Sequence, residues 1–348
     1  MKGVFYALLA ALLFGASTPL AKSLLPQMTP LMLAGLLYLG SGVGLGAYSF
    51  LRSRRGDPSR NEAALTRKDA PWLAGAIVAG GVIGPVLLMW GLGATPASSA
   101  SLLLNLEGVL TALLAWFVFK ENFDRRIALG MALIAAGGVS LSWTGRLEPG
   151  VPWSSLAIVG ACLAWAIDNN LTRKVSAGDP VQIAMLKGLV AGGVNTGLAL
   201  ALGAKLPAAP SLLATGVVGF FGYGVSLTLF VLALRHIGTA RTGAYFSIAP
   251  FVGAAISVFL LGDKLTIGFS LAAVLMAFGV WLHLTERHEH KHRHELMEHE
   301  HLHWHDDHHQ HTHGPAAPPG EPHSHPHRHE PLIHSHPHYP DIHHRHGH

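Results

Sequence analysis

Three ionisable side chains lie within long apolar stretches of the sequence: Glu107, Asp168 and Lys187. Inside a membrane such a group costs about 2.5–3.5 kcal/mol on insertion scales, so each is a functional candidate. We expect Asp168 and Lys187 at comparable depth in one helical hairpin, which favours a salt bridge, because a paired buried charge costs much less than a lone one. This pair could serve a binding site or could only orient the hairpin.

One predicted helix carries an aromatic ring, a carboxylate, an amide and a hydroxyl on a single face. These residues are Trp165, Asp168, Asn169 and Thr172, spaced i, i+3, i+4 and i+7. That spacing is typical of one face of a helix. The combination suits an amine-bearing solute. The same stripe could instead join helices through hydrogen bonds, which use the same residue types.

A second apolar stretch holds Asn105 and Glu107, which lie about 200° apart around a helix. Only one of them can face a cavity squarely. We expect Glu107 to face protein or water, because a carboxylate that faces lipid is the costlier outcome. A carboxyl that protonates near neutral pH could also exchange protons with the solution. Tyr223, in another stretch, is expected to be a packing aromatic.

The elements that must position these groups are membrane helices. Of 348 residues, 50% are hydrophobic and only 13% charged, against about 25% charged in soluble domains. A disordered chain is excluded and an ordinary soluble enzyme is disfavoured. About 20 apolar residues can span a bilayer, and ten such stretches predict an all-α integral membrane protein. They are 4–24, 30–51, 71–92, 97–119, 127–144, 153–172, 181–202, 212–234, 243–261 and 267–285.

The charges of the connecting loops predict the orientation. With a cytoplasmic N-terminus, the inside segments of residues 1–285 carry 14 Lys and Arg and the outside loops carry 4. Because basic residues are retained in cytoplasmic loops, we expect both termini to lie in the cytoplasm and the protein to be integral to the cell (inner) membrane.

The second half of the sequence repeats the first. Residues 72–142 align without gaps on 214–284, so that Gly80 falls on Gly222, and Phe14 matches Trp165 in an earlier segment. Each unit holds five spans, and five is odd, so the second unit must be inverted relative to the first. Inverted repeats are common in secondary transporters, whose substrate site lies near the midplane between the halves. We predict two repeats, 1–145 and 146–285, followed by a tail, 286–348.

Each unit resembles the EamA repeat. It opens with a pair of one aromatic and one small residue, followed by a Lys or Arg about seven residues later. Its fourth span ends in an acidic residue, in AWFVFKE (115–121) and SVFLLGD (257–263). Two such units resemble the ten-span branch of the drug/metabolite transporter superfamily, over residues 3–285. Lys187 stands where the family usually has Arg. The resemblance implies a central cavity lined by both units and export of small organic solutes.

The tail is rich in histidine, with 23 of the 25 histidines of the chain. If 286–312 continues as helix, eight of them form i,i+4 pairs that could each present two imidazoles to one ion. They are His288, His290, His292, His294, His299, His301, His303 and His305. Imidazole suits Zn, Ni, Cu and Co. Alternatively, the tail is a disordered segment of biased composition that binds metal without using it, and the prolines and charges of 314–348 preclude a packed core.

These observations favour a transporter over an enzyme. No nucleotide-binding or hydrolase motif occurs, so the energy is expected to come from a gradient, and no cofactor is expected in the transport core. The basic residues follow the membrane topology and do not predict a nucleic-acid partner; the oligomeric state is not predicted. The expected partners are the bilayer, a small-molecule substrate and, at the tail, divalent metal ions.

Three functions stay open. The first is a gradient-driven exporter of a small metabolite such as an amino acid or related amine, with Glu107 as a coupling group. The second is a transporter of a transition metal or metal chelate that the tail feeds or regulates. The third is a membrane-anchored metal buffer or sensor. One cysteine, Cys162, excludes an internal disulfide and a cysteine-based metal site.

Overall fold

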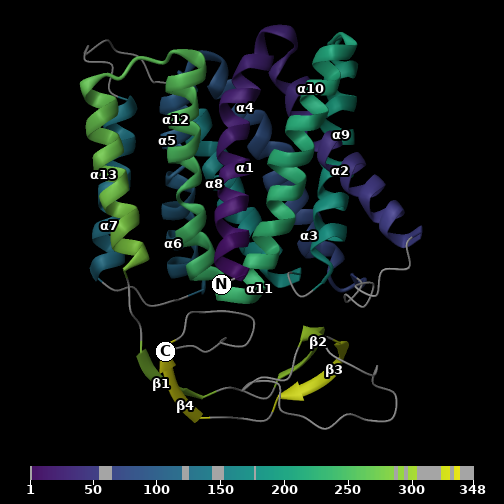
Figure 1. The fold of residues 1–348 in the computed structure, drawn as a ribbon, viewed down its shortest axis with the longest axis vertical. Coiled ribbons are helices and arrows are strands. Elements are labelled where there is room, and N and C mark those ends of the chain that lie inside the picture. Colours follow the sequence, from purple (N-terminus) through teal and green to yellow (C-terminus); the bar gives the residue numbers. More distant parts are fainter. Residues whose placement is uncertain are drawn as a thin grey trace.

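The computed structural model shows a bundle of helices that run nearly along one axis (Figure 1). The structure describes residues 2–54, 65–119, 125–142, 153–175 and 178–285, together with four short segments of the tail, 289–293, 297–303, 323–329 and 333–337. Helix is found within each of the ten predicted stretches. The prediction of an all-α membrane protein is therefore confirmed for the part of the chain before the tail.

The first repeat contributes eight helical segments and a short connecting turn. They are α1 (Lys2–Leu24), η1 (Leu25–Gln27), α2 (Pro30–Arg54), α3 (Ala70–Ala76), η3 (Ile77–Ile83), α4 (Gly84–Ala94), α5 (Ala97–Leu103), α6 (Leu106–Phe119) and α7 (Arg125–Ser142). The π-helical turns of η3 join α3 to α4, so that 70–94 form one continuous rod. The predicted fourth span, in contrast, is divided between α5 and α6.

The second repeat has the matching order. Its segments are α8 (Trp153–Val175), α9 (Pro180–Ala201), α10 (Ala209–Gly219), η4 (Phe220–Val225), α11 (Ser226–Phe246), α12 (Ala249–Leu261) and α13 (Ile267–Leu284). Local sequence determines where several of these helices begin or end. Asp179 accepts hydrogen bonds from the backbone N–H of Val181 and Gln182 at the start of α9, as N-cap residues do. Gly262 ends α12 in a left-handed conformation with φ of 69°, which glycine adopts without steric cost.

Among the described residues, five continuous helical stretches are long and apolar enough to cross a membrane. They are Gly3–Gln27, Pro30–Arg54, Ala70–Ala94, Pro180–Ala201 and Ala209–Ala233. Three shorter apolar helices are Ala128–Leu141, Ala249–Leu261 and Ile267–Leu282. The membrane character is thus shown within the described residues, while the count of ten crossings stays a prediction.

The two repeats pack together through contacts between helices of one repeat and helices of the other. The opening helix of the first repeat, α1, packs against α11 and α12 of the second, and α8 packs against α4 and α6 of the first. The second helices, α2 and α9, pack together, as do the last ones, α7 and α13. Where α2 crosses α9, Gly42 and Gly188 bring the backbones so close that a Cβ on Gly188 would lie 2.7 Å from the Gly42 Cα. Small residues permit such close helix packing in membranes.

One predicted loop is helical. We expected a connection over 235–242 and a ninth span from 243, but α11 continues to Phe246 and the next helix starts only at Ala249. The charges of Arg235 and Arg241 mark a polar boundary. They do not end the helix, because arginine, leucine and alanine are good helix formers.

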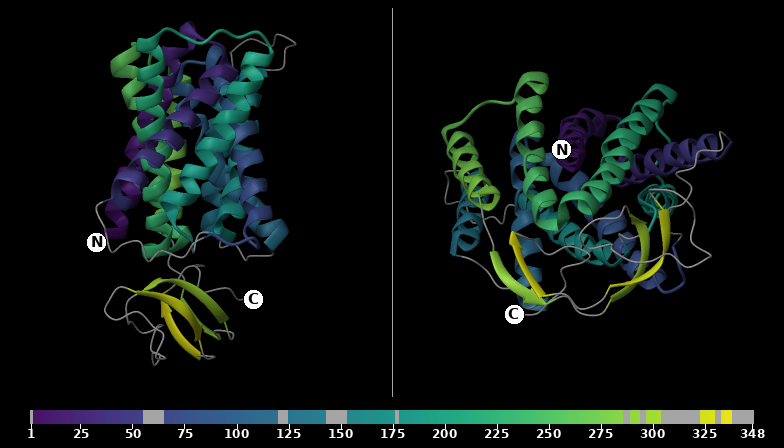
Figure 2. Two further views of the ribbon diagram at one scale, coloured as in Figure 1. Left: turned by 90° about the vertical axis from the view of Figure 1, so that its right-hand side faces the viewer. Right: turned by 60° about the horizontal axis from the view of Figure 1, so that its bottom comes forward.

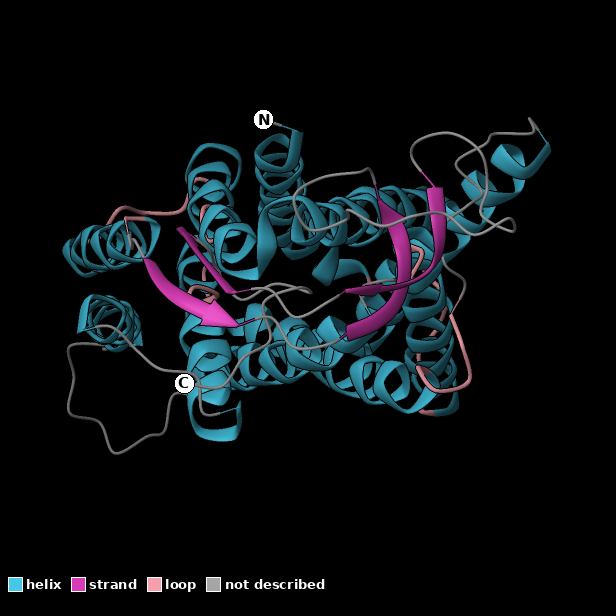
Figure 3. Cartoon of the chain, turned by 90° about the horizontal axis from the view of Figure 1, so that it is seen from below, coloured by secondary structure: helices cyan, strands magenta, loops and turns pink. Residues whose placement is uncertain are grey.

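The tail is not helical where the structure describes it, so the helix considered for 286–312 is absent from 289–293 and 297–303. It forms four strands, β1 (Glu289–Arg293), β2 (Met297–His303), β3 (His323–His329) and β4 (Ile333–Pro337). β1 pairs with β4 and β2 with β3, both antiparallel. The two ladders lie beyond the end of the bundle at which α1 begins (Figures 2 and 3). Histidine recurs at every second residue in these segments, and a period of two favours strand over helix.

Candidate functional site

A cavity lies between helices of both repeats. Its walls come from α1, α2 and α6 of the first repeat and from α8, α9, η4 and α11 of the second. Ten lining side chains are charged, amide-bearing or aromatic: Glu107, Asp168, Asn169, Lys187, Phe14, Tyr38, Trp165, Tyr223, Phe230 and Phe246. The others are small or aliphatic: Ser41, Ala184, Gly188, Gly222, Ser226 and Leu227.

The aromatic side chains form a connected wall around Phe14. Its ring centroid lies 5.9 Å from those of Trp165 and Tyr223 and 5.4 Å from that of Phe246. Two further contacts, at 5.3 and 4.9 Å, join the remaining rings, Tyr38 and Phe230. These separations lie within the favourable range for aromatic pairs. Because aromatic rings attract cations over their faces, the wall suits an apolar or cationic part of a solute.

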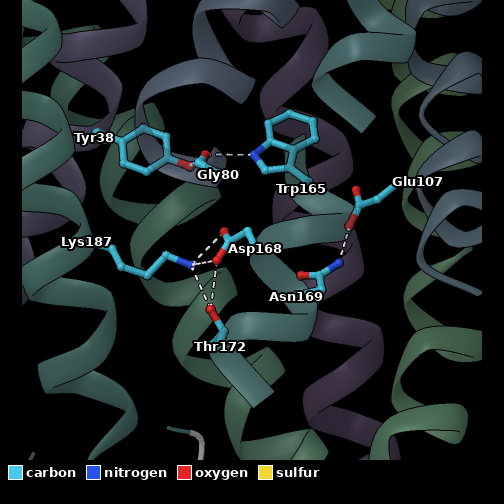
Figure 4. A network of polar contacts seen from close by, with 8 residues as sticks. All are labelled: Tyr38, Gly80, Glu107, Trp165, Asp168, Asn169, Thr172 and Lys187. Atoms are coloured by element: carbon cyan, nitrogen blue, oxygen red, sulfur yellow. Dashed lines mark hydrogen bonds and ion pairs between the residues drawn. The ribbon is translucent and has the colours of Figure 1, made fainter. Parts of the chain in front are cut away.

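The ion pair that the sequence predicts is present in the lining of the cavity (Figure 4). Lys187 Nζ lies 2.6 and 2.7 Å from the two carboxylate oxygens of Asp168 and donates to Thr172 Oγ1 at 3.2 Å. The Thr172 hydroxyl in turn donates to Asp168 Oδ1 at 2.8 Å. Lys187 is 2% exposed and Asp168 6%. All three ammonium donors therefore have acceptors, and the negative charge of Asp168 is compensated.

Glu107 is the second carboxylate of the cavity, and a break in the helix positions it. Between α5 and α6 the backbone N–H groups of Leu104 and Asn105 bond carbonyls three residues back, at 3.2 and 3.0 Å, and Glu107 then falls in the first turn of α6. The side chain of Asn169 donates to Glu107 Oε1 at 2.7 Å. Within the described part of the chain, Glu107 has this amide partner and forms no ion pair.

Matched π-helical turns frame the site. Residues 78–83 of η3 correspond to 220–225 of η4 in the alignment of the repeats. A π turn interrupts the regular i to i−4 bonding of the helix, and such turns are frequent at functional sites. The Gly80 carbonyl accepts hydrogen bonds from the Tyr38 hydroxyl at 2.8 Å and the Trp165 Nε1 at 2.9 Å. These bonds connect α2 and α8 to the same point of η3.

The two repeats differ in the residue that packs against the glycine of the π-helical turn. A Cβ on Gly80 would overlap the carboxylate of Asp168, and a Cβ on Gly222 would lie 2.6 Å from the Cβ of Ser17. Ser17 and Asp168 occupy equivalent positions of α1 and α8. The chain therefore keeps the close approach between glycine and the opening helix in both halves, but only the second repeat places a charge there.

Of the residues predicted for the site, Glu107, Trp165, Asp168, Asn169 and Lys187 line the cavity. Thr172 is not among the lining residues, but its hydroxyl hydrogen-bonds both Asp168 and Lys187. Asn105 is not brought to the cavity. Its amide donates to the Leu102 carbonyl at 3.1 Å and lies 3.8 Å from Met276 Sδ.

Sequence reasoning missed most of the aromatic wall. Phe14, Tyr38, Phe230 and Phe246 were not candidates, and Tyr223, expected to be a packing aromatic, lines the cavity. The Tyr223 hydroxyl lies near Ser17 but has no hydrogen-bond partner among the described residues. The pairing of Phe14 with Trp165 in the repeat was the signal that could have identified Phe14.

The structure describes the backbone of five of the eight candidate histidines of the tail. His290 and His292 lie in β1, and His299, His301 and His303 in β2, whereas His288, His294 and His305 lie outside the described residues. The i,i+4 pairs predicted for a helix are therefore absent from these two strands. Among the side chains that the structure describes, which exclude those of the tail strands, no group of three or more His, Cys, Asp or Glu could hold a metal ion.

Comparison with known families gives two matches along the chain. The profile of the EamA-like transporter family matches residues 1–143 and again 152–285. A crystal structure of another protein superposes with a TM-score of 0.62 at 16% identity, covering 81% of this chain and 95% of that one. At this identity the superposition shows a shared fold and nothing finer.

Several curated transporters are similar in sequence. A protein of Methanothermobacter thermautotrophicus named "Uncharacterized transporter" is 29% identical, over 80% of this chain and 85% of its own length. The "Uncharacterized inner membrane transporter YedA" of Escherichia coli K12 is 27% identical, over 73% and 81%. A Salmonella typhimurium protein named "Probable amino-acid metabolite efflux pump" is 28% identical, over 81% and 95%.

Proposed function

The chain belongs to the EamA-like transporter family, and we propose that it exports an amino acid or a related amine, driven by a gradient. A similar protein carries the name of an amino-acid metabolite efflux pump. That similarity supports the direction and the solute class. The stronger support is the chemistry of the cavity.

The observation that carries the proposal is the carboxylate of Glu107 in a cavity walled by aromatic rings. Asp168 is already compensated by Lys187, at 2.6 and 2.7 Å, so the three charged residues of the lining sum to one uncompensated negative charge. Glu107 has an amide donor from Asn169 and no cation among the described residues. A solute ammonium supplies that missing charge, and the rings of Phe14 and Tyr223 favour a cation beside it.

The ion pair has a different task in this proposal. All three donors of Lys187 are used by Asp168 and Thr172, so Lys187 has none left for a solute carboxylate in this conformation. The amine is therefore the group that the cavity selects. Asp168 and Lys187 hold α8 against α9 and so keep Asn169 directed at Glu107.

Glu107 also offers a means of coupling. When its carboxyl takes up a proton, the negative charge that holds the ammonium is removed, and the solute is released. Glu107 then binds either the proton or the solute. A proton that enters from one side of the membrane therefore releases the solute to that same side. We propose proton exchange as the energy source on this basis.

The orientation follows from the loop charges, and we propose that both termini lie in the cytoplasm. Reporter fusions at residue 60 and after residue 290 should then give a cytoplasmic signal, and a fusion at residue 148 an external one. An external signal at residue 60 contradicts both the charge count and the inverted arrangement of the repeats.

The transport test uses vesicles that hold the full chain and a panel of labelled amines, amino acids and neutral analogues. Neighbouring asparagines provide a matched pair of variants. Asn169→Ala removes the donor to Glu107, whereas Asn170→Ala removes a side chain that bonds the Ala166 carbonyl of its own helix at 2.9 Å.

We expect export of amine-bearing solutes, loss of that export and of its pH dependence in Glu107→Gln, and a clear reduction in Asn169→Ala. Asn170→Ala should behave as the unmodified chain does. Equal export of neutral analogues, or full activity of Glu107→Gln, contradicts the proposal.

A further inference from the structure

The end of the bundle at which α1 finishes, away from the tail strands (Figure 1), is closed by packed apolar side chains. Six residues of one buried cluster lie there, two from each of three helices. They are Ala21 and Leu24 of α1, Leu88 and Leu92 of α4, and Ala97 and Ala100 of α5. We call these six residues the outer plug, because the proposed orientation places this end outside the cell.

The outer plug separates the cavity from this end of the bundle. Gly84, the first residue of α4, packs against Trp165 of the cavity wall, since a Cβ on Gly84 would lie 3.0 Å from Trp165 Nε1. Leu88 and Leu92 follow one and two turns later along α4. At their level α4 packs against the start of α8, through Gly91, whereas the cavity-lining residues of α8 all come from its second half. A solute in the cavity can therefore leave by this end only if the outer plug separates.

Lys22 of α1 binds the end of α4 beside the outer plug. Its Nζ donates to the carbonyl oxygens of Leu92, Gly93 and Thr95, at 2.5, 3.2 and 3.0 Å. The last carbonyls of a helix have no partner within the helix, and a lysine side chain can satisfy them. Lys22 therefore joins α1 to the turn between α4 and α5 through three hydrogen bonds.

Asp263 approaches the same turn from the second repeat. Its Oδ2 accepts a hydrogen bond from the backbone N–H of Ser98 at 2.8 Å, and its negative charge attracts the Lys22 ammonium. Asp263 follows the end of α12, and Ser98 lies at the start of α5. These contacts connect the ends of helices, so they can break while every helix keeps its own backbone hydrogen bonds.

The short helix α5 links this turn to the solute site. It has seven residues, Ala97–Leu103, and the break at 104 and 105 follows it and places Glu107 in the first turn of α6. A displacement of α5 away from α1 and α12 would open the outer plug and move the segment that positions Glu107. The closing contacts and the carboxylate of the cavity thus lie at opposite ends of one short helix.

We propose that Lys22 and Asp263 form a lock that holds the outer end of the solute pathway closed in this conformation, and that release of the solute requires this lock to open. The proposal rests on the proposed function in taking the cavity as the solute pathway. Loss of either side chain shifts the population from the conformation closed at the outer end towards one that is open there.

The test measures how fast a membrane-impermeant maleimide reaches a thiol behind the lock. Full-length chains carry Cys162→Ala, which removes the one native thiol, and Leu88→Cys, at a site that is 0% exposed. The lock variants are Lys22→Met and Asp263→Ala. Lys264→Met is the matched control, because it removes a positive charge one residue from Asp263 at an exposed side chain. Lys22→Arg retains a cation with several donors and should retain the lock.

With the reagent at the outer face of intact cells, we expect both lock variants to be labelled at least about tenfold faster than the chain with an intact lock, because labelling follows the population of the open conformation. Lys264→Met and Lys22→Arg should be labelled slowly. A second reporter, Leu227→Cys, lines the cavity and is labelled from the cytoplasmic face in inverted vesicles. There the lock variants should react more slowly than the chain with an intact lock, since a conformation open at the outer end is closed at the other.

Equal labelling of the lock variants and Lys264→Met at the outer face overturns the proposal. Faster labelling there without slower labelling from the cytoplasmic face overturns it as well, since it indicates local loosening of the outer end and no exchange between two conformations. If Lys22→Met does not fold, Asp263→Ala provides the same comparison. The assay uses no solute, so a failure of amine selection by Glu107 does not affect it, and the reporter fusions at residues 60 and 148 establish independently which face is external.

Discussion

The transport core and the tail arrange their polar residues by opposite means. In the core, a few polar side chains lie in an apolar bundle and are positioned by contacts from another helix. The side-chain amide of Asn169, for example, donates a hydrogen bond to Glu107 Oε1 at 2.7 Å. In the tail, one residue type recurs, and its arrangement comes from strand register, as in His301 opposite His325. In the core, therefore, the identity of a single residue matters, whereas in the tail its position relative to a periodic pattern matters.

The largest effect is expected where a core charge loses its partner. Lys187→Ala leaves Asp168 buried without compensation, and Asp168→Ala does the same to Lys187. Removing one member of a buried pair costs about 3–5 kcal/mol, and removing both costs less. Thermal unfolding of the detergent-purified variants should give a double variant that is more stable than either single one. Strictly additive losses would mean that the two residues do not interact.

The next effect concerns close packing at the site. Gly80→Ala brings a methyl group into the Asp168 carboxylate, and overpacking typically costs about 1–3 kcal/mol. We expect reduced stability and reduced amine export. Gly193→Ala in α9 is the matched control, since no atom lies within 4 Å of a Cβ at that position. If both variants keep full activity, the contact between η3 and α8 has no importance for the site.

The smallest effect on the core is expected from removing the tail. A chain ending at residue 285 should bind little Zn²⁺ or Ni²⁺ in calorimetry and should export amines at the rate of the full chain. This outcome separates the two regions cleanly. Amine export that requires the tail would show that they act as one unit and would favour regulation of the core by metal.

The sequence predicts the core well because membrane burial leaves a strong signal. Apolar length locates the helices, and the cost of intramembrane charge singles out Glu107, Asp168 and Lys187. What it does not predict depends on packing between distant segments. Phe230 and Phe246 are ordinary apolar residues until α11 folds beside α1, and the break that turns Glu107 into the cavity has no marker such as proline.

The tail shows the opposite limit. Its composition indicates metal binding, but i,i+4 and i,i+2 spacings are both present in the same histidines, so the ligand set cannot be chosen from one segment. The pairing of β2 with β3 involves residues twenty or more positions apart, His301 and His325 among them. Only the register decides which histidines are paired across the strands.

The measurement that tests the central claim most directly is equilibrium binding of a small amine to the purified full chain, compared with a neutral analogue of the same shape. If Glu107 and the aromatic wall select a cation, calorimetry will show binding of the amine and at least about tenfold weaker binding of the analogue, equivalent to about 1.4 kcal/mol. Glu107→Gln should remove that difference. Equal affinities for the charged and neutral solutes in the unmodified chain would contradict the account.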